Sequence, residues 1–400
     1  MNENFYASLK TLSLYRPVLE TPVGKGLDGL FSELFLHGNH VPAMEAYCGV
    51  FYALAEEGYD SLGNWLLDKL RYGDFPYAEL AAAGKDTPAL TGAARRDVEL
   101  LGRMAALDCG DIKARIRELC PAQWEDTVAA LPEWERGADI NFDALREFYR
   151  ANGAGIFARY RAFVWSHDRL LPVEHPDFVP EEALWGYRLQ REKVVANTRA
   201  LVEGRAVNNV LLFGEPGTGK SATVKSLLGM KGFEKLRLIE IRKNDLGDLG
   251  ELLRQLANRP QKFILFIDDL SFDKEDLTYS LVKSVLEGGL EPRAANVAVY
   301  ATSNRRNLVR QNFSDRSGDE VDINETIQEK TSLAERFGVR VAFSGLTRNQ
   351  YLAMVEELAR RRGIDLPVET LRSEAIKWEM RHAGRTPRTV VQFLANLHIG

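Results

Sequence analysis

The sequence has few cysteines and no long apolar run, and each absence excludes a class of protein. Three cysteines in 400 residues are too few for a disulfide scaffold. Cys48, Cys109 and Cys120 also lack the spacing of a metal site, so we expect reduced, buried thiols. The longest apolar stretches resemble Phe263–Ile267, far short of the roughly 20 residues that a membrane-spanning helix needs. We therefore expect no membrane span.

The chain also lacks the features of a secreted or disordered protein. Asn2, Glu3, Asn4 and Lys10 interrupt any apolar signal-peptide core, which favours a cytoplasmic protein. Hydrophobic residues make up 45% of the chain and charged residues 27%, as in ordinary globular proteins. The length of 400 residues predicts two or three domains.

No dense basic stripe marks a nucleic-acid surface, although charge is unevenly distributed. Residues 1–180 carry 27 acidic and 18 basic side chains, and the remainder carries 30 and 34. The basic excess thus falls in the half that holds the phosphate-binding motif described below, consistent with an anionic ligand. His37, His40 and His167 are scattered and form no metal-binding pattern.

The pattern of apolar residues along the sequence changes near residue 180. Apolar groups recur at helical spacing before it, as in Met44–Ala55, and the segment 171–180 contains three prolines. We expect the aromatic residues of this first part to lie in its core, namely Tyr47, Phe51, Tyr52, Trp65, Trp124 and Trp134.

Beyond residue 180, short apolar runs alternate with helical patterns. This alternation predicts a parallel sheet with helices on both faces. Past Thr347 the pattern is wholly helical. We expect an all-α N-terminal domain over 1–180, an α/β domain over 181–345 and a small helical lid over 346–400. The strands are expected at 209–213, 236–241, 262–267, 296–301 and 339–343, with helices at 246–256 and 277–286 between them.

The segment Gly214–Ser221 reads GEPGTGKS and matches the phosphate-binding pattern G-x-x-x-x-G-K-[ST]. It follows a strand-like run and precedes a helix-like one, which is the context the motif requires. Backbone amides would surround a phosphate, Lys220 would reach the β- and γ-phosphates, and Ser221 would hold Mg²⁺.

The apolar run 262–267 leads into Asp268 and Asp269. Two carboxylates at the carboxyl edge of a sheet could bind Mg²⁺ through Asp268 and polarise a water through Asp269. An exposed acidic turn after a core strand is the alternative. Asn304 follows the next strand and could orient that water, or serve only in a turn.

Three arginines could complete the site. Arg336 precedes the fifth strand and could reach a neighbouring subunit's nucleotide, or pair with an acid on its own surface. Arg388 begins the last helix after Pro387 and could reach back to the phosphates, or stay in solvent. Arg385 is a second candidate for that role.

The order of these motifs resembles an AAA+ ATPase over residues 181–400. The phosphate loop corresponds to Walker A and Asp268–Asp269 to Walker B, and Leu184–Tyr187 sits where the superfamily holds the adenine ring. The chain is similar, more narrowly, to a family of bacterial ATP-binding AAA+ proteins of unassigned function. The stretches that carry this likeness are 208–214, 268–272, 287–291, 300–306 and 313–320.

The resemblance implies ATP and Mg²⁺ as cofactors and a nucleotide held between subunits of a ring-shaped or helical homo-oligomer, of which a hexamer is one form. Arg336 would then act on the neighbour's nucleotide and Arg388 on its own. Asp269 stands where the commonest AAA+ pattern has Glu, although initiator-like and helicase-loader-like clades also have Asp. The implied nucleotide contacts are Trp185, Gly186, Glu215, Pro216, Gly217, Thr218, Gly219, Lys220, Ser221, Ala222 and Arg388.

Three functions fit these features. The first is an ATPase that works on a macromolecular partner, most simply a protein recognised by residues 1–180. The second is a nucleotide-gated interaction protein with little turnover. The third is a DNA-handling loader or transposition helper, which Arg305, Arg306 and Arg310 support and the acidic N-terminal region opposes.

Overall fold

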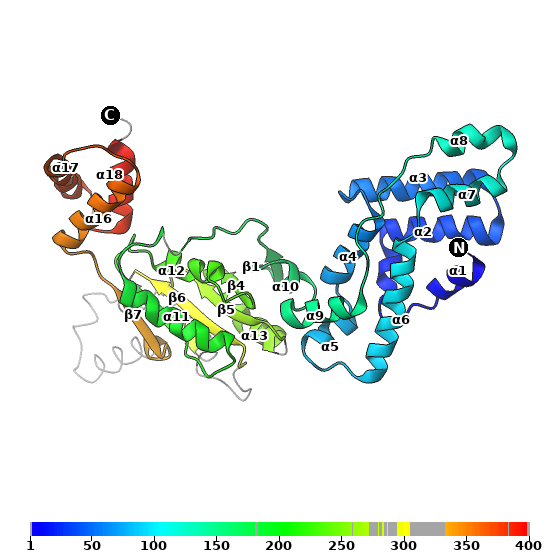
Figure 1. Cartoon of the computed structure of the whole chain (residues 1–400). Coiled ribbons are helices and arrows are strands. Elements are labelled where there is room, and N and C mark those ends of the chain that lie inside the picture. Colours follow the sequence, from blue (N-terminus) through cyan, green and yellow to red (C-terminus); the bar gives the residue numbers. More distant parts are fainter. Residues whose placement is uncertain are drawn as a thin grey trace. The chain divides into compact units, whose positions relative to one another are not determined.

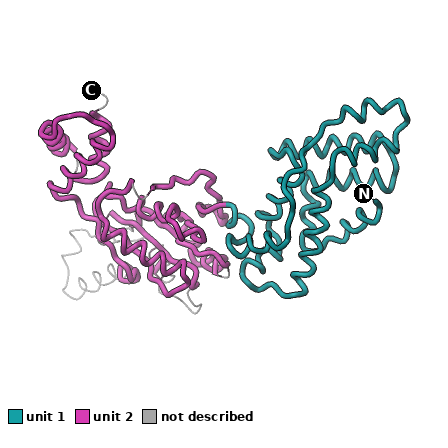
Figure 2. The backbone as a smooth tube through the Cα atoms, viewed as in Figure 1, with its two compact units in different colours: residues 1–159 teal, residues 160–400 magenta. Residues whose placement is uncertain are grey.

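The chain forms two compact units, Met1–Arg159 and Tyr160–Gly400, drawn in different colours in Figure 2. The computed structural model describes residues 2–180, 183–257, 259–271, 279, 282–283, 286, 294–304, 333–382 and 384–397. The division falls about twenty residues before the expected boundary at 180. Four of the five stretches that carry the family likeness, and the three arginines at 305, 306 and 310, lie wholly or partly outside the described residues.

The first unit is helical, as expected (Figure 1). Glycine and proline residues mark the ends of its helices. Pro88 begins α6, and Gly84, Pro121 and Pro132 follow the ends of α5, α7 and α8. One apolar core joins its helices. The elements are α1 (Glu3–Leu9), η1 (Arg16–Glu20), α2 (Pro22–Ser32), η2 (Glu33–His37), α3 (His40–Glu56), α4 (Leu62–Tyr72), α5 (Pro76–Ala82), α6 (Pro88–Ala105), α7 (Cys109–Leu119), η3 (Ala122–Trp124), α8 (Glu125–Ala129), α9 (Phe142–Asn152) and α10 (Ile156–Arg159).

Two expectations for this unit were wrong in part. The three cysteines are free, but only Cys109 is buried and Cys48 is exposed. Trp65 is fully buried, whereas Tyr52 on α3 is 66% exposed. Tyr52 lies on the outer face of α3, where its hydroxyl donates to Glu56 at 3.3 Å. Among the described residues, no helix is both long and apolar enough to cross a membrane.

A β-hairpin stands where we expected the end of the helical region. Strands β1 (Ala162–Ser166) and β2 (Arg169–Pro172) pair antiparallel, and β1 then pairs in parallel with β4 (Leu236–Ile241) of the second unit. His167 and Asp168 form the two-residue turn with φ angles of 49° and 59°, as a tight hairpin turn requires. The hairpin therefore belongs to the sheet and moves the boundary toward the N-terminus.

The second unit contains a seven-stranded sheet in the order β2-β1-β4-β5-β6-β3-β7, parallel except for β2. The expected strand at 236–241 is β4, and the other four agree with expectation to within two residues. Strand β6 lies between β3 and β5, so the three loops that follow these strands meet at one edge. The remaining strands are β3 (Val210–Gly214), β5 (Lys262–Ile267), β6 (Val297–Ser303) and β7 (Val339–Phe343).

Helices cover both faces of this sheet. One face packs against α11 (Arg188–Val202) and α12 (Lys220–Ser226) in a single apolar cluster. The alternate strand residues, such as Leu211 and Leu265, are buried as well. The predicted helix at 246–256 forms as η6 (Lys243–Asp248) followed by α13 (Leu249–Ala257), and η5 (Leu227–Gly229) extends α12. The helix expected at 277–286 lies mostly outside the described residues.

A three-helix lid with its own core follows β7. It consists of α16 (Arg348–Arg361), α17 (Val368–Arg381) and α18 (Pro387–Leu397). Thr347 caps α16 in a reciprocal capping box with Gln350, and Pro387 occupies the first turn of α18, as expected. The fold is thus the predicted α/β sandwich with a helical lid, preceded by a helical unit.

Candidate nucleotide site

The loop after β3 forms the floor of the site. Gly214 has a φ of 135°, and a Cβ there would lie 2.1 Å from the carbonyl oxygen of Phe343, so the loop leaves the sheet where only glycine fits. Helix α12 begins at Lys220. The Lys220 amine donates to the carbonyls of Gly214 and Glu215 at 2.9 and 2.7 Å, and to the Asn304 side-chain oxygen at 3.0 Å.

The electrostatics of this lysine fit a site for anions. Burial lowers the pKa of the Lys220 amine, while the carboxylates of Asp269 and Asp268 act in the opposite direction. Five basic side chains and two acidic ones line the cavity around it, which favours a negatively charged ligand. The basic residues are Arg191, Lys220, Arg361, Arg362 and Arg388, and the acidic ones are Asp268 and Asp269.

The two acids after β5 lie beside this loop. The Ser221 hydroxyl donates to the Asp268 carboxylate at 2.6 Å. Asp269 has a left-handed φ of 53° and accepts a 2.8 Å hydrogen bond from the Asn304 side-chain amide. Asn304 thus bridges Lys220 and Asp269. The structure brings together the residues that the sequence places after three different strands.

The oxygen atoms of Ser221 and Asp268 fit a magnesium ion. Mg²⁺ prefers hard oxygen ligands and is commonly held by one or two carboxylates together with substrate phosphates. A hydroxyl and a carboxylate lie in contact here on the cavity wall, next to the phosphate loop. These two side chains are therefore the ones that would hold the ion.

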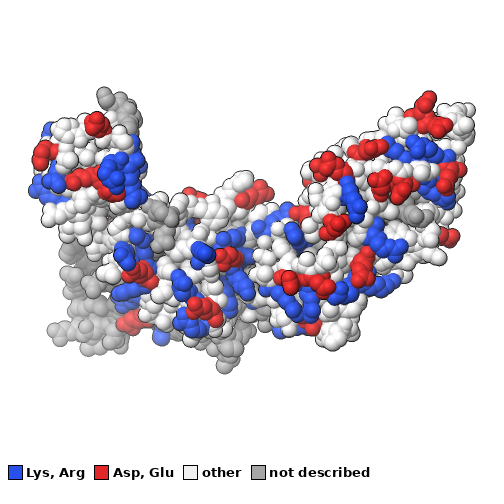
Figure 3. Space-filling model, viewed as in Figure 1, with Lys and Arg blue, Asp and Glu red and all other residues white. Residues whose placement is uncertain are grey.

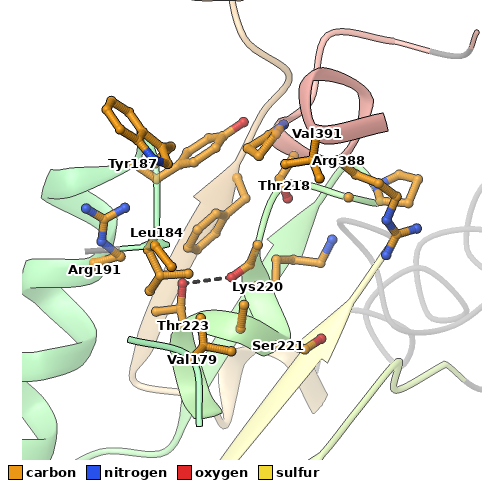
Figure 4. Close-up of a pocket in the computed structure, with 18 of the residues that line it drawn as sticks. Val179, Leu184, Tyr187, Arg191, Thr218, Lys220, Ser221, Thr223, Arg388 and Val391 are labelled. Atoms are coloured by element: carbon orange, nitrogen blue, oxygen red, sulfur yellow. Dashed lines mark hydrogen bonds between the residues drawn. The ribbon is translucent and has the colours of Figure 1, made fainter. Parts of the chain in front are cut away.

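The lid closes the cavity from the other side. The backbone amide of Arg388 donates to the Gly217 carbonyl at 3.2 Å, and a Cβ on Gly217 would lie 3.0 Å from the Arg388 Cβ. In Figure 4 the Arg388 side chain enters from α18, with Arg191 on the opposite side of Lys220. Arg385 does not line the cavity, because its side chain pairs with Glu379 at 2.6 Å.

The segment before α11 forms an apolar end of the cavity. Leu184, Trp185 and Tyr187 line it together with Met354 and Leu358 of α16. Tyr187 adopts a left-handed φ of 53°, which turns its hydroxyl to the Ser344 carbonyl at 2.6 Å, and burial raises its pKa to about 12. The whole cavity measures about 820 Å³, within the usual range for small-ligand sites.

The other expected contacts divide into those that line this cavity and those that do not. Pro216, Gly217, Thr218, Gly219 and Ala222 all line it. Gly186 lines a neighbouring cavity of about 420 Å³ behind Trp185. Glu215 points to the connection between β7 and α16, since a Cβ on Gly345 would lie 2.5 Å from its carboxylate.

Arg336 lies apart from the cavity of its own chain. It is exposed just before β7 and is not among the lining residues. The structure therefore does not bring Arg336 to the phosphate loop of the same subunit.

Several cavity residues are missing from the sequence prediction. The Arg361 guanidinium lies 4.4 Å from the centre of the Trp185 ring, a cation–π contact between the lid and the segment before α11. Met354, Leu358 and Arg361 recur at helical spacing and could have been recognised as one face of α16. Thr302 precedes Asn304 by two residues, near the end of β6, and both line the cavity.

The two lid arginines make a matched pair for mutation. For the ATPase activity that the motifs predict, we expect Arg388→Ala to lower ATP turnover on the order of 10²-fold, because it removes a charge that enters the cavity. Arg385→Ala should leave turnover near the wild-type value and destabilise the lid by about 1 kcal/mol, because its ion pair with Glu379 is only partly buried. Steady-state phosphate release and thermal unfolding measure the two effects. The reverse order of effects would assign the nucleotide contact to Arg385.

The chain is similar to solved structures at low sequence identity. No curated protein matches the sequence. Among solved structures, a point mutant of Thermotoga maritima RuvB is 16% identical over 55% of this chain, with a TM-score of 0.39. A second T. maritima RuvB structure, described as a Holliday junction branch migration motor, is 17% identical over 55%, with a TM-score of 0.37. The chain spans 64% of the length of these two RuvB structures.

A family model described as "Protein of unknown function (DUF815)" matches residues 158–399, more than half of the chain. The match begins beside the hairpin and extends through the lid. The chain belongs to the DUF815 family, which confirms the expected likeness to a family of unassigned function.

Proposed function

We propose that this protein is an AAA+ ATPase that binds and hydrolyses ATP with Mg²⁺ and uses the energy to act on a macromolecular partner. The observation that carries the proposal is the convergence of three loops on one cavity wall. Lys220 contacts Asn304, Asn304 contacts Asp269, and Ser221 contacts Asp268. A phosphate-binding loop, a metal-type acid and a second acid within reach are the parts that phosphoryl transfer to water needs.

Each side chain has a distinct task in this proposal. The backbone amides of residues 217–221 and the Lys220 amine bind the phosphates, and the lid stacks its apolar residues against the base. A magnesium ion would neutralise phosphate charge in the transition state. Asp269 accepts the proton of the attacking water, and Asn304 holds that carboxylate in place. Arg388 adds positive charge from the lid.

The assembly and the partner are the finer parts of the proposal. Arg336 is exposed and lies outside its own cavity, which supports a role at a neighbour's nucleotide in a ring or helical homo-oligomer. The helical first unit would recognise the partner. That unit carries 24 acidic and 16 basic residues, and charges of both signs are interspersed on the face in Figure 3, which favours a protein over DNA. The cytoplasm is the proposed location.

A nucleotide-gated switch is the second candidate, and one contact favours it. One oxygen of the Asp269 carboxylate already accepts from Asn304, and the side chain is one methylene shorter than Glu. Because base geometry is sensitive to about 1 Å, this arrangement could bind ATP and turn it over only slowly.

The variant Asp269→Asn tests the proposal. It should bind ATP as the wild type does but lower phosphate release about 10²-fold or more, since a positioned base contributes on that order. Asp365→Asn removes an exposed carboxylate from the lid and should change neither quantity. If the wild-type chain binds ATP but releases phosphate no faster than Asp269→Asn, the switch is the correct function.

The same variant can identify the partner. Held in the ATP-bound state, the Asp269→Asn chain should retain its partner during affinity capture longer than the wild type does. A captured partner that dissociates equally fast from both chains would argue against coupling between hydrolysis and partner release.

A further inference from the structure

Thr302 contacts both acids of the site through one hydroxyl. Its Oγ1 donates to the Asp268 carboxylate at 2.5 Å and accepts from the backbone amide of Asp269 at 2.9 Å. Its carbonyl oxygen also accepts from the backbone amide of Leu270 at 2.7 Å. A single residue of β6 therefore holds three consecutive residues of the loop after β5.

These bonds begin where the sheet ladder ends. The pairing of β5 with β6 runs to Ile267 opposite Ala301, so the amides that follow need new acceptors. Thr302 supplies two of them. Its hydroxyl also donates to the same Asp268 oxygen that Ser221 contacts, and this leaves the other carboxylate oxygen for a further ligand.

The position of Thr302 is fixed from the other side by the phosphate-loop strand. Thr302 pairs with Leu212 of β3, two residues before that strand ends at Gly214, and it is only 2% exposed. Thr302 therefore links the two acids directly to β3, the strand that leads into the phosphate loop. A buried hydroxyl with both partners satisfied is also a rigid support.

The hydrogen bond between Thr302 and the Asp269 amide affects the backbone conformation of Asp269. A non-glycine residue at a φ of 53° adopts the sparsely populated left-handed region and keeps it only where the surroundings fix it. The Thr302 hydroxyl accepts a hydrogen bond from the backbone amide of Asp269. This bond helps to hold the turn in which the Asp269 side chain reaches Asn304.

We propose that Thr302 is a positioning residue that orients Asp268 and Asp269 and thereby sets the magnesium dependence of nucleotide binding. The inference rests on the proposed binding of ATP with Mg²⁺ in this cavity. Groups that hold a metal's carboxylate ligand typically change metal affinity or activity 10–100-fold when removed.

The test compares two nearly isosteric variants in the full-length chain. Thr302→Val removes the hydroxyl and keeps the shape, and Thr198→Val does the same at a buried threonine of α11 that contacts Val194 and Tyr300. The affinity for a fluorescent ATP analogue is measured at increasing Mg²⁺ and again without it. We expect Thr302→Val to need roughly 10-fold more Mg²⁺ for half-maximal tightening, with metal-free affinity unchanged. Thr198→Val should match the wild type, and Thr302→Ser should restore the wild-type response.

The same Mg²⁺ requirement in Thr302→Val and the wild type would overturn the inference, as would a Thr302→Ser variant as defective as Thr302→Val. Should Thr302→Val fail to fold, Thr302→Ala carries the same comparison. The experiment measures nucleotide binding, so its result does not depend on the proposed ATPase activity. A wild-type chain that binds the analogue with Mg²⁺ but releases no phosphate would refute hydrolysis, and the Mg²⁺ requirement of Thr302→Val would still decide the role of Thr302.

Discussion

The Lys220→Ala chain should lose ATP hydrolysis and bind ATP much more weakly than the wild type. The Lys220 amine lies between the phosphate loop and Asn304, at the point where the loop meets the acids. It is buried, with 6% of its surface exposed, so its charge is poorly screened by solvent. Removing one such preorganised donor costs about 10²–10³-fold in turnover. Isothermal titration with ATP and phosphate release measure the two losses.

Lys225→Ala is the matched control for this experiment. Lys225 lies on the same helix, but it is not among the residues that line the cavity, and it contacts Asp177 at 3.5 Å. The same loss of one positive charge should therefore leave binding and turnover near their wild-type values. If both variants lose activity equally, the effect comes from α12 as a whole and the phosphate loop is not the binding site.

Arg336→Ala should bind ATP normally and lose on the order of 10³-fold in turnover, the usual contribution of an arginine that reaches a neighbour's phosphates. Arg336 is exposed and outside the cavity of its own chain, so its loss should not disturb nucleotide binding there. Phosphate release by the assembled protein measures the effect. Arg340→Ala is the control, because Arg340 is exposed four residues further on, on β7.

Mixing variants tests whether the arginine acts between subunits. An Arg336→Ala subunit has an intact phosphate loop, and a Lys220→Ala subunit has an intact arginine. Mixed assemblies should therefore recover part of the wild-type turnover at sites that combine the two. Turnover that stays at the level of the single variants at every mixing ratio would place Arg336 outside the reaction.

Local sequence patterns were sufficient to predict five of the seven strands of the described sheet and the phosphate loop. The central strands β5 and β6 are buried on both faces, so they appear as continuous apolar runs such as 262–267, and the loop's glycines directly follow another such run. The hairpin of β1 and β2 escaped prediction because its turn, His167–Asp168, contains no glycine or asparagine to signal a tight hairpin.

The rest of the site depends on contacts between distant segments. The contact of Thr302 with Asp268 crosses 34 positions in the sequence, and the stacking of Arg361 on Trp185 joins the lid to the segment before α11. Asp269, with its left-handed φ, likewise donates its backbone amide to Thr302, 33 positions away in the sequence. Such pairings are set by the register of the strands and by the placement of the lid, which a single sequence does not reveal.

The central claim is that the cavity beside Lys220 binds a nucleoside triphosphate together with Mg²⁺. Calorimetric titration of the full-length wild-type chain with ATP, with and without Mg²⁺, tests it most directly. The account predicts saturable binding of one ATP per chain that Mg²⁺ strengthens and that Lys220→Ala greatly weakens. A folded wild-type chain that takes up no ATP, or uptake that Lys220→Ala retains in full, would contradict it.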